Sequence, residues 1–87
     1  MSQAKIESLL DAALTRLGFA QPFTYKVDVP PRPEMGDYAA NAAIAGAKRL
    51  ARKPLELARQ ISAAIEALDK EKIFRKIEIA GPGFINF

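Results

Sequence analysis

The segment GPGFINF, residues 81–87, combines a turn signal with an alternating strand pattern. Glycine accepts positive φ values, and proline fixes its own φ and has no N–H for a sheet ladder, so residues 81–83 predict a turn. In the strand that follows, Phe84 and Asn86 share one face, opposite to Ile85. A ring beside an amide suits an unstacked base, because the ring stacks and the amide bonds the base edge. Phe at a strand position is also common in hydrophobic cores, so a purely structural interpretation stays open.

The segments before this turn predict a strand and a helix. In residues 73–79, Ile77 and Ile79 alternate with polar side chains, so we expect a strand that pairs back on residues 84–87 as a hairpin. Pro54 fits the first position of a helix, where its missing N–H costs nothing. The apolar stripe of that helix comprises Leu57, Ile61, Ala64, Ile65 and Leu68.

An alanine-rich stretch lies further upstream and predicts another helix. Asp37 fits an N-cap, and we expect the helix to run from Tyr38 to Arg52. Its buried face is expected to contain Ala39, Ala43, Gly46 and Leu50. Because glycine costs roughly 1 kcal/mol relative to alanine inside a helix, Gly46 indicates a close approach of another backbone. Asn41 is either a polar group presented to a ligand or an ordinary exposed residue.

The N-terminal third predicts one helix and one strand. Ser2 fits an N-cap and Gly18 a helix end, and the buried stripe between them comprises Ile6, Leu9, Leu10, Ala13 and Leu17. Residues 23–29 alternate apolar and polar side chains, as a half-buried antiparallel strand does. Residues 30–33, Pro-Pro-Arg-Pro, lack ladder donors, so the strand should stop at Val29 and the chain continue extended to Gly36.

The order of these elements predicts the fold class. Helix, strand, helix, helix, strand, strand is typical of an α+β domain of two layers, with a small antiparallel sheet covered by helices on one face. The 87 residues correspond to a single domain, residues 1–87. A second strand near residues 30–36 is not located by the pattern.

Composition excludes several classes of function. The chain has no cysteine and no histidine, which removes thiol nucleophiles, imidazole bases, disulfides and nearly every zinc site, and we expect no catalytic, cofactor or metal site. No apolar run approaches the length of a membrane span, and no signal peptide is visible, so a membrane partner is not expected. The net charge of +3 permits a polyanionic partner without indicating that charge alone provides binding.

Basic side chains are the candidates for phosphate contacts. Lys48 and Arg52 lie toward the end of the predicted helix of residues 38–52, and Arg32 lies in the proline-rich loop. Cations at a helix C-terminus are also favoured by the backbone dipole, by roughly 0.3–1 kcal/mol each. A solvated arginine in a loop likewise needs no ligand.

Two motifs carry a family resemblance. The segment GDYAAN, residues 36–41, and the closing GPGFINF, with Lys53-Pro54 and the helices between them, resemble the N-terminal additional domain of arginyl-tRNA synthetases over essentially the whole chain. The resemblance implies two units of one helix and two strands each. It also implies contact with the D-loop, at the outer corner of the tRNA, through Phe84, Asn86 and the adjoining Gly83.

The resemblance further implies a larger parent protein in the cytoplasm. That parent attaches arginine to tRNA with ATP, and ATP and Mg²⁺ bind in a class I catalytic domain that this chain lacks. The catalytic domain of the same polypeptide would therefore be a partner beside tRNA. The chain is expected to be a fragment without catalytic activity of its own. We also expect the fragment to self-associate through its last strand or through Phe84 and Phe87.

The alternative is a structural or protein-interaction α+β domain without RNA contact. In that case Phe84 and Phe87 both belong to the core. The two hypotheses differ in one observable, which is whether Phe84 and Asn86 are exposed on a common face flanked by basic side chains.

Overall fold

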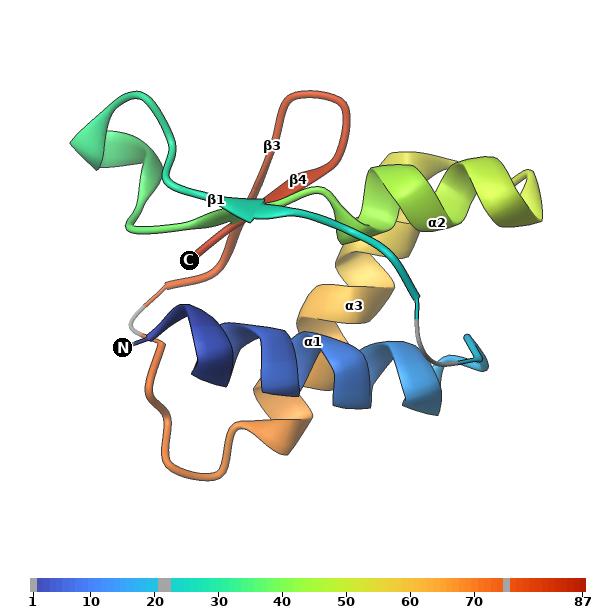
Figure 1. Ribbon diagram of the computed structural model, residues 1–87, viewed down its shortest axis with the longest axis horizontal. Coiled ribbons are helices and arrows are strands. Elements are labelled where there is room, and N and C mark those ends of the chain that lie inside the picture. The colour runs from blue at the N-terminus through green and yellow to red at the C-terminus, as the bar shows by residue number, and fades with distance from the viewer. Residues whose placement is uncertain (1, 21–22, 75) are drawn as a thin grey trace.

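The computed structural model describes residues 2–20, 23–74 and 76–87, and it confirms a small α+β domain (Figure 1). The elements in chain order are α1 (Gln3–Arg16), β1 (Val27–Asp28), the 3₁₀ turn η1 (Pro33–Met35), β2 (Ala39–Ala40), α2 (Ala42–Leu50), α3 (Pro54–Leu68), β3 (Glu78–Ala80) and β4 (Phe84–Asn86). The strands form one antiparallel sheet in the order β1-β2-β4-β3. The second strand missing from the sequence pattern is therefore β2.

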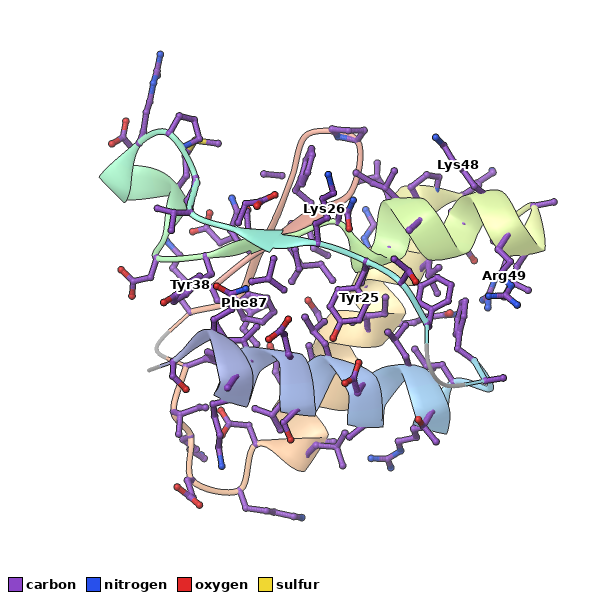
Figure 2. The ribbon with its side chains drawn as sticks, in the orientation of Figure 1. Tyr25, Lys26, Tyr38, Lys48, Arg49 and Phe87 are labelled. Atoms are coloured by element: carbon purple, nitrogen blue, oxygen red, sulfur yellow. The ribbon has the colours of Figure 1, made fainter. Side chains whose placement is uncertain are left out.

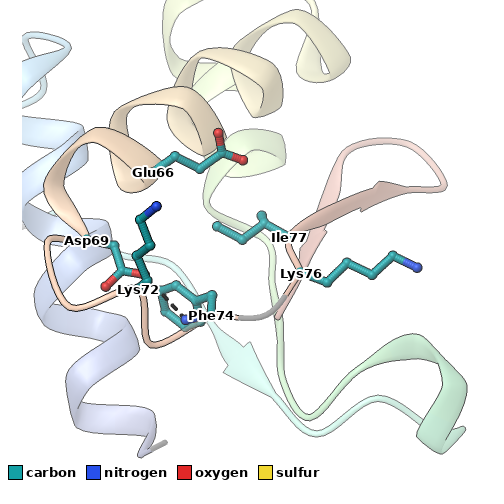
Figure 3. Close-up of a pocket in the computed structure, with 6 residues that line it drawn as sticks. All are labelled: Glu66, Asp69, Lys72, Phe74, Lys76 and Ile77. Atoms are coloured by element: carbon teal, nitrogen blue, oxygen red, sulfur yellow. Dashed lines mark hydrogen bonds between the residues drawn. The ribbon is translucent and has the colours of Figure 1, made fainter.

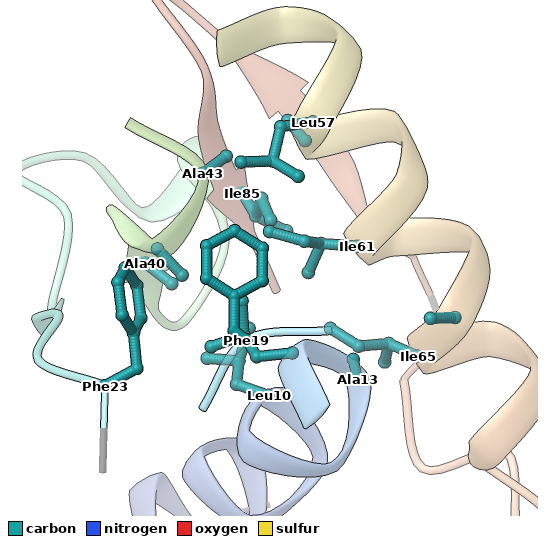
Figure 4. Close-up of a cluster of buried hydrophobic side chains, with 14 of the residues drawn as sticks. Leu10, Ala13, Phe19, Phe23, Ala40, Ala43, Leu57, Ile61, Ile65 and Ile85 are labelled. Atoms are coloured by element: carbon teal, nitrogen blue, oxygen red, sulfur yellow. The ribbon is translucent and has the colours of Figure 1, made fainter. Parts of the chain in front are cut away.

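Helix α3 packs against both α1 and α2, and the sheet is contacted by α2 through β4 and by α3 through β3 and β4. Ile85 of β4 and Ala40 of β2 are fully buried and face Leu10 of α1 and Ile61 of α3 in the same cluster (Figure 4). Burial of such side chains removes apolar area from water at about 25 cal/mol per Å², which is the main stabilising contribution in a chain without disulfides. In the part of the chain that the structure describes, none of the three α-helices covers the opposite face of the sheet, and the 3₁₀ turn η1 lies beside that face through Met35.

The ends of the helices follow the sequence pattern. The Ser2 hydroxyl accepts a hydrogen bond from the Lys5 backbone N–H at 3.2 Å, as an N-cap does. At the other end of α1, Gly18 has a φ of +96°, and Phe19 N–H donates to the Leu14 carbonyl at 2.9 Å. These contacts form a Schellman motif. Pro54 is the first residue of α3, as predicted.

The prediction of a helix from Tyr38 with Asp37 as its N-cap is wrong. Ala39 and Ala40 form the strand β2 between β1 and β4, and α2 begins at Ala42 after the N-cap position Asn41. Alanine favours helix by only tenths of a kcal/mol over most residues, so pairing on both sides of the strand outweighs the local preference. The expected burial of Leu50 is also wrong, because this side chain is 47% exposed at the end of α2.

The two longer predicted strands are also shorter in the structure. Of residues 23–29 only 27 and 28 belong to β1, and Val29 is 74% exposed because the proline run takes the chain away from the sheet. Of residues 73–79 only 78 and 79 lie in β3, and residue 75 falls outside the described residues. Gly46 does mark a close approach, but its neighbours are the side chains of Phe19 and Leu57 rather than a backbone.

Candidate nucleic-acid interface

The face of the sheet away from α1, α2 and α3 carries Phe84 and Asn86, together with side chains from the other three strands. Paired residues in an antiparallel sheet point to the same face, so the register places Asp28, Ala39, Asn86 and Glu78 in one row across this face. Continued by one residue, the same register gives a neighbouring row of Lys26, Asn41, Phe84 and Ala80. We call these two rows the open face.

A groove of about 510 Å³ crosses the open face. Its floor comes from the two rows and its walls from the loop after β1 and the hairpin turn; the lining residues are Asp28, Val29, Pro30, Pro31, Met35, Ala39, Asn41, Ala80, Gly81, Pro82, Phe84 and Asn86. The exposed large apolar side chains in this groove are Val29, Met35 and Phe84. Exposed apolar groups gathered in one hollow indicate a binding surface rather than scattered surface residues.

Phe84 meets the requirement for a stacking platform. Its side chain is 40% exposed, whereas Phe87 on the opposite face is only 5% exposed and packs on Phe74 with ring centroids 4.8 Å apart. The structural alternative with both rings in the core is therefore wrong for Phe84 and right for Phe87. An exposed ring in a groove can stack on a base without displacing core contacts.

Asn86 lies on the groove floor beside Phe84. Only 7% of it is exposed, and its backbone pairs with Glu78 on one side and Ala39 on the other. Its side-chain amide makes no hydrogen bond to the residues that the structure describes. Since buried polar groups are normally bonded, an amide left available at the base of a groove is suited to a ligand that supplies the missing partners.

Gly83 lies in the hairpin turn directly before Phe84. It is buried with a φ of +133°, and a Cβ at this position would lie 3.1 Å from Pro54 Cβ and 3.3 Å from the Pro54 carbonyl oxygen. Gly83 is not among the residues that line the groove. Its absent side chain lets the hairpin rest on the start of α3, which positions Phe84 one residue later.

Asn41 is the groove residue whose arrangement the sequence did not predict. Its Oδ1 accepts from the Lys26 backbone N–H at 2.7 Å, and its own N–H donates to the Lys26 carbonyl at 3.0 Å. These bonds fix Asn41 against the strand next to β2, and its amide N–H₂ group is left for the groove. Asparagine is favoured at N-cap positions, and this preference could have indicated a helix start at Asn41 rather than Asp37.

The basic residues predicted for phosphate contacts are not gathered at the groove. Lys48 follows Asn41 by about two helical turns, or about 10 Å at the helix rise of 1.5 Å per residue. Arg52 lies beyond it and donates to Gln60 Oε1 at 2.7 Å, and Arg49 sits 5.7 Å from the centroid of the Phe23 ring. Figure 2 shows Lys48 and Arg49 on α2, at the side of the molecule away from β1.

Two cations lie nearer to the open face than Lys48 and Arg52. Arg32 is exposed in the loop that walls the groove, although it does not itself line it. Lys26 belongs to the row of Phe84, just before β1 (Figure 2), and it was not among the basic residues predicted to contact phosphate. Its position on the polar side of the alternation in residues 23–29 is the signal that could have found it.

Carboxylates are also present on the open face. Asp28 lines the groove, and Glu78 on the other side of Asn86 forms an exposed ion pair with Lys76. This ion pair raises the pKa of the Lys76 ammonium. Among the described residues no Lys or Arg side chain lines the groove, so the groove accommodates a neutral group better than a phosphate.

A second hollow, of about 380 Å³, lies where α3 leads into β3 (Figure 3). Its lining includes Asp69, whose carboxylate accepts from the backbone N–H groups of Ile73 at 3.1 Å and Phe74 at 3.3 Å. Asp69 therefore has a structural role in this loop. The described part of the chain contains no cluster of acidic side chains suited to a metal ion and no helix that could span a membrane.

Comparison with known proteins identifies the family of this chain. The family described as "Arginyl tRNA synthetase N terminal domain" matches residues 4–87. Curated relatives named arginine–tRNA ligase include those of Thermotoga maritima (46% identity over 63 residues), Laribacter hongkongensis (48% over 79) and Pasteurella multocida (57% over 53). These matches cover 72%, 88% and 61% of this chain.

The same matches cover only 11%, 13% and 9% of the three relatives, so this chain spans a small part of their length. The matched stretch contains both GDYAAN and GPGFINF, because the family match extends to Phe87. The chain belongs to the family of arginyl-tRNA synthetase N-terminal domains.

Proposed function

We propose that this domain binds tRNA and that its open face recognises one unstacked base of the D-loop. The observation that carries this proposal is the exposed ring of Phe84 beside the amide of Asn86, which is nearly buried and unbonded, in a single groove. Phe84 provides the stacking surface, and Asn86 provides a donor and an acceptor for the base edge. Phosphates next to the base lie near Lys26 and Arg32.

The groove supplies a modest share of the binding energy. One base stacked on an aromatic ring contributes roughly 1–3 kcal/mol, and a few phosphate contacts add a salt-dependent part. We therefore expect the 87-residue domain alone to bind tRNA with a dissociation constant around or above ~10⁻⁵ M at physiological salt. Tight binding has to come from contacts made by the rest of a longer protein.

The longer protein that we propose is an arginine–tRNA ligase like the relatives that the chain matches. In that protein the catalytic domain binds ATP, Mg²⁺ and arginine, and the present domain holds the outer corner of the same tRNA. Such a protein acts in the cytoplasm, where tRNA is charged. The domain's contribution is to position the tRNA, since Phe84 and Asn86 are suited to recognition rather than bond making.

The test replaces Phe84 in the full-length protein. Phe84→Ala should weaken binding of a tRNA-Arg transcript by roughly 1–3 kcal/mol, the usual value of one aromatic stack, while arginine binding stays unchanged. Asn86→Ala should reduce discrimination at the contacted base more than it reduces overall affinity.

Leu55→Ala is the matched control, because Leu55 is 44% exposed, close to the 40% of Phe84, but lies on α3 outside the groove. If Phe84→Ala and Leu55→Ala have the same small effect on tRNA binding in folded proteins, the groove does not bind RNA. The open face would then be better explained as a contact surface for another protein domain.

A further inference from the structure

We propose that Asp28 is a specificity-determining residue of the groove, whose carboxylate accepts a hydrogen bond from an exocyclic amino group of the base. This inference rests on the proposed function, because it concerns the base that stacks on Phe84. A surface that binds a polyanion is not expected to carry a carboxylate, and the proposal gives this carboxylate a role.

The register places Asp28 opposite Asn86 across the groove floor. Both belong to one row, with Ala39 of β2 between them. Two strand spacings of about 4.8 Å separate their Cα atoms by roughly 10 Å. Because Ala39 has only a methyl group, the space above it is open, and the groove passes between the two polar side chains.

Asp28 is the carboxylate of this row that remains available. Glu78, the other acidic residue of the row, is engaged with Lys76. Asp28 makes no ion pair or hydrogen bond within the part of the chain that the structure describes. A free carboxylate that lines a groove repels phosphate, so what enters beside it has to offer N–H donors.

The chemistry of the two side chains selects a class of base. An ionised carboxylate only accepts hydrogen bonds, whereas the amide of Asn86 both donates and accepts. An exocyclic amino group has two N–H donors, one for Asp28 and one for the Asn86 oxygen, and the neighbouring ring nitrogen accepts from the Asn86 N–H₂ group. A keto oxygen in the same place is also only an acceptor, so it cannot form a hydrogen bond with the carboxylate and is repelled by it. The groove therefore favours adenine or cytosine over hypoxanthine or uracil.

The experiment first locates the base. Full-length wild-type and Phe84→Ala proteins are titrated with tRNA-Arg transcripts that each carry one changed D-loop nucleotide. The contacted nucleotide is the one whose replacement changes the affinity for the wild-type protein but not the affinity for Phe84→Ala. At that position, transcripts with an amino base and with its keto counterpart, adenosine against inosine or cytidine against uridine, are then compared.

Two variants distinguish a hydrogen bond from a general effect of charge. Asp28→Asn and Glu78→Gln each remove one negative charge from the same row and nearly preserve side-chain shape. Wild type and Glu78→Gln should prefer the amino base by about tenfold or more, since tenfold corresponds to the lower end of the range for one hydrogen bond to a charged group. Asp28→Asn should bring the ratio close to one, because its amide can also donate to a keto oxygen.

The outcomes separate this inference from the proposed function. If Phe84→Ala weakens binding but wild type shows no amino preference, or Asp28→Asn retains that preference, the role of Asp28 is wrong and RNA binding stands. The same conclusion holds if both charge variants simply tighten binding equally. If Phe84→Ala leaves the binding of every transcript unchanged, the proposed function itself fails and this inference fails with it.

Discussion

Replacement of Gly36 by alanine should destabilise the domain more than any exposed-loop substitution normally does. Gly36 has a φ of +100°, which L side chains rarely adopt, and a Cβ there would collide with the Phe87 carbonyl oxygen and lie 3.1 Å from the Phe87 carbonyl carbon. Asp37 N–H donates to that oxygen at 2.6 Å and Tyr38 N–H at 3.2 Å. The carbonyl cannot move away without weakening both bonds.

The magnitude follows from these two contributions. A non-glycine residue at positive φ costs roughly 1–2 kcal/mol, and two weakened backbone hydrogen bonds cost about 0.5–1.5 kcal/mol each. Gly36→Ala should therefore lower the free energy of unfolding by about 2–5 kcal/mol, a large share of the stability of a small domain.

Gly18→Ala provides the matched control. Gly18 has a nearly identical φ of +96°, but no heavy atom lies within 4 Å of the position that a Cβ would occupy. Urea unfolding followed by circular dichroism should give a loss of only about 1–2 kcal/mol for this variant, the cost of the backbone conformation alone. Equal losses for the two variants would refute the argument that the Phe87 carbonyl is the cause.

Three further predictions concern other parts of the molecule. Tyr25 donates from its hydroxyl to Asp11 Oδ1 at 2.7 Å, so Tyr25→Phe should cost about 1 kcal/mol in urea unfolding at neutral pH. Burial, followed by the Asp11 hydrogen bond, raises the pKa of Tyr25 above its ordinary value of about 10. The contribution of Tyr25 to the free energy of unfolding is therefore lost as the pH rises above 10, and the stability of Tyr25→Phe should fall less steeply with pH in that range. Lys26→Ala should weaken the binding of every tRNA sequence and lower the slope of the logarithm of affinity against the logarithm of salt concentration by about one. Lys48→Ala should change both the affinity and this slope less, and titrations at several salt concentrations measure both. The 87-residue chain should self-associate at high concentration through its open face, and sedimentation should show a smaller effect of concentration for Phe84→Ser.

The expected route of self-association changes with the structure. β4 is an interior strand, paired with β2 on one side and β3 on the other, so its backbone offers no free edge. Phe87 is buried, which leaves Phe84 as the exposed ring of the pair. Association through the backbone of the last strand, or through Phe87, is therefore not supported.

Local patterns predicted the helices that bury a clear apolar stripe and the hairpin at residues 78–86. In α3, Leu57, Ile61 and Ile65 recur at helical spacing, and in the hairpin the glycines allow the turn that brings β3 and β4 together. In both cases the deciding interactions lie close together in the sequence. The face occupied by Phe84 could be predicted for the same reason, since alternation along one strand needs no partner.

The composition of the open face could not be predicted, because it depends on pairing between distant segments. Ala39 and Ala40 have no strand preference of their own and become a strand through contacts with residues 27–28 and 85–86. A shift of one residue in the pairing of β1 with β2 would remove Asp28 from the row of Asn86. The loop between these strands contains no two-residue turn that would fix the register in advance.

The two sequence motifs prove to be one structural unit. Phe87 N–H donates to the Tyr38 carbonyl at 2.8 Å, and the pairing continues through Ala39 with Asn86 and Ala40 with Ile85. GDYAAN therefore provides the strand on which GPGFINF is supported, and its small Ala39 leaves the space beside Asn86 open. A larger side chain at 39 would fill the groove without disturbing the core, because the core side of this strand is occupied by Ala40. The requirement for small residues in GDYAAN thus has two separate physical causes, packing on one face and access for a ligand on the other.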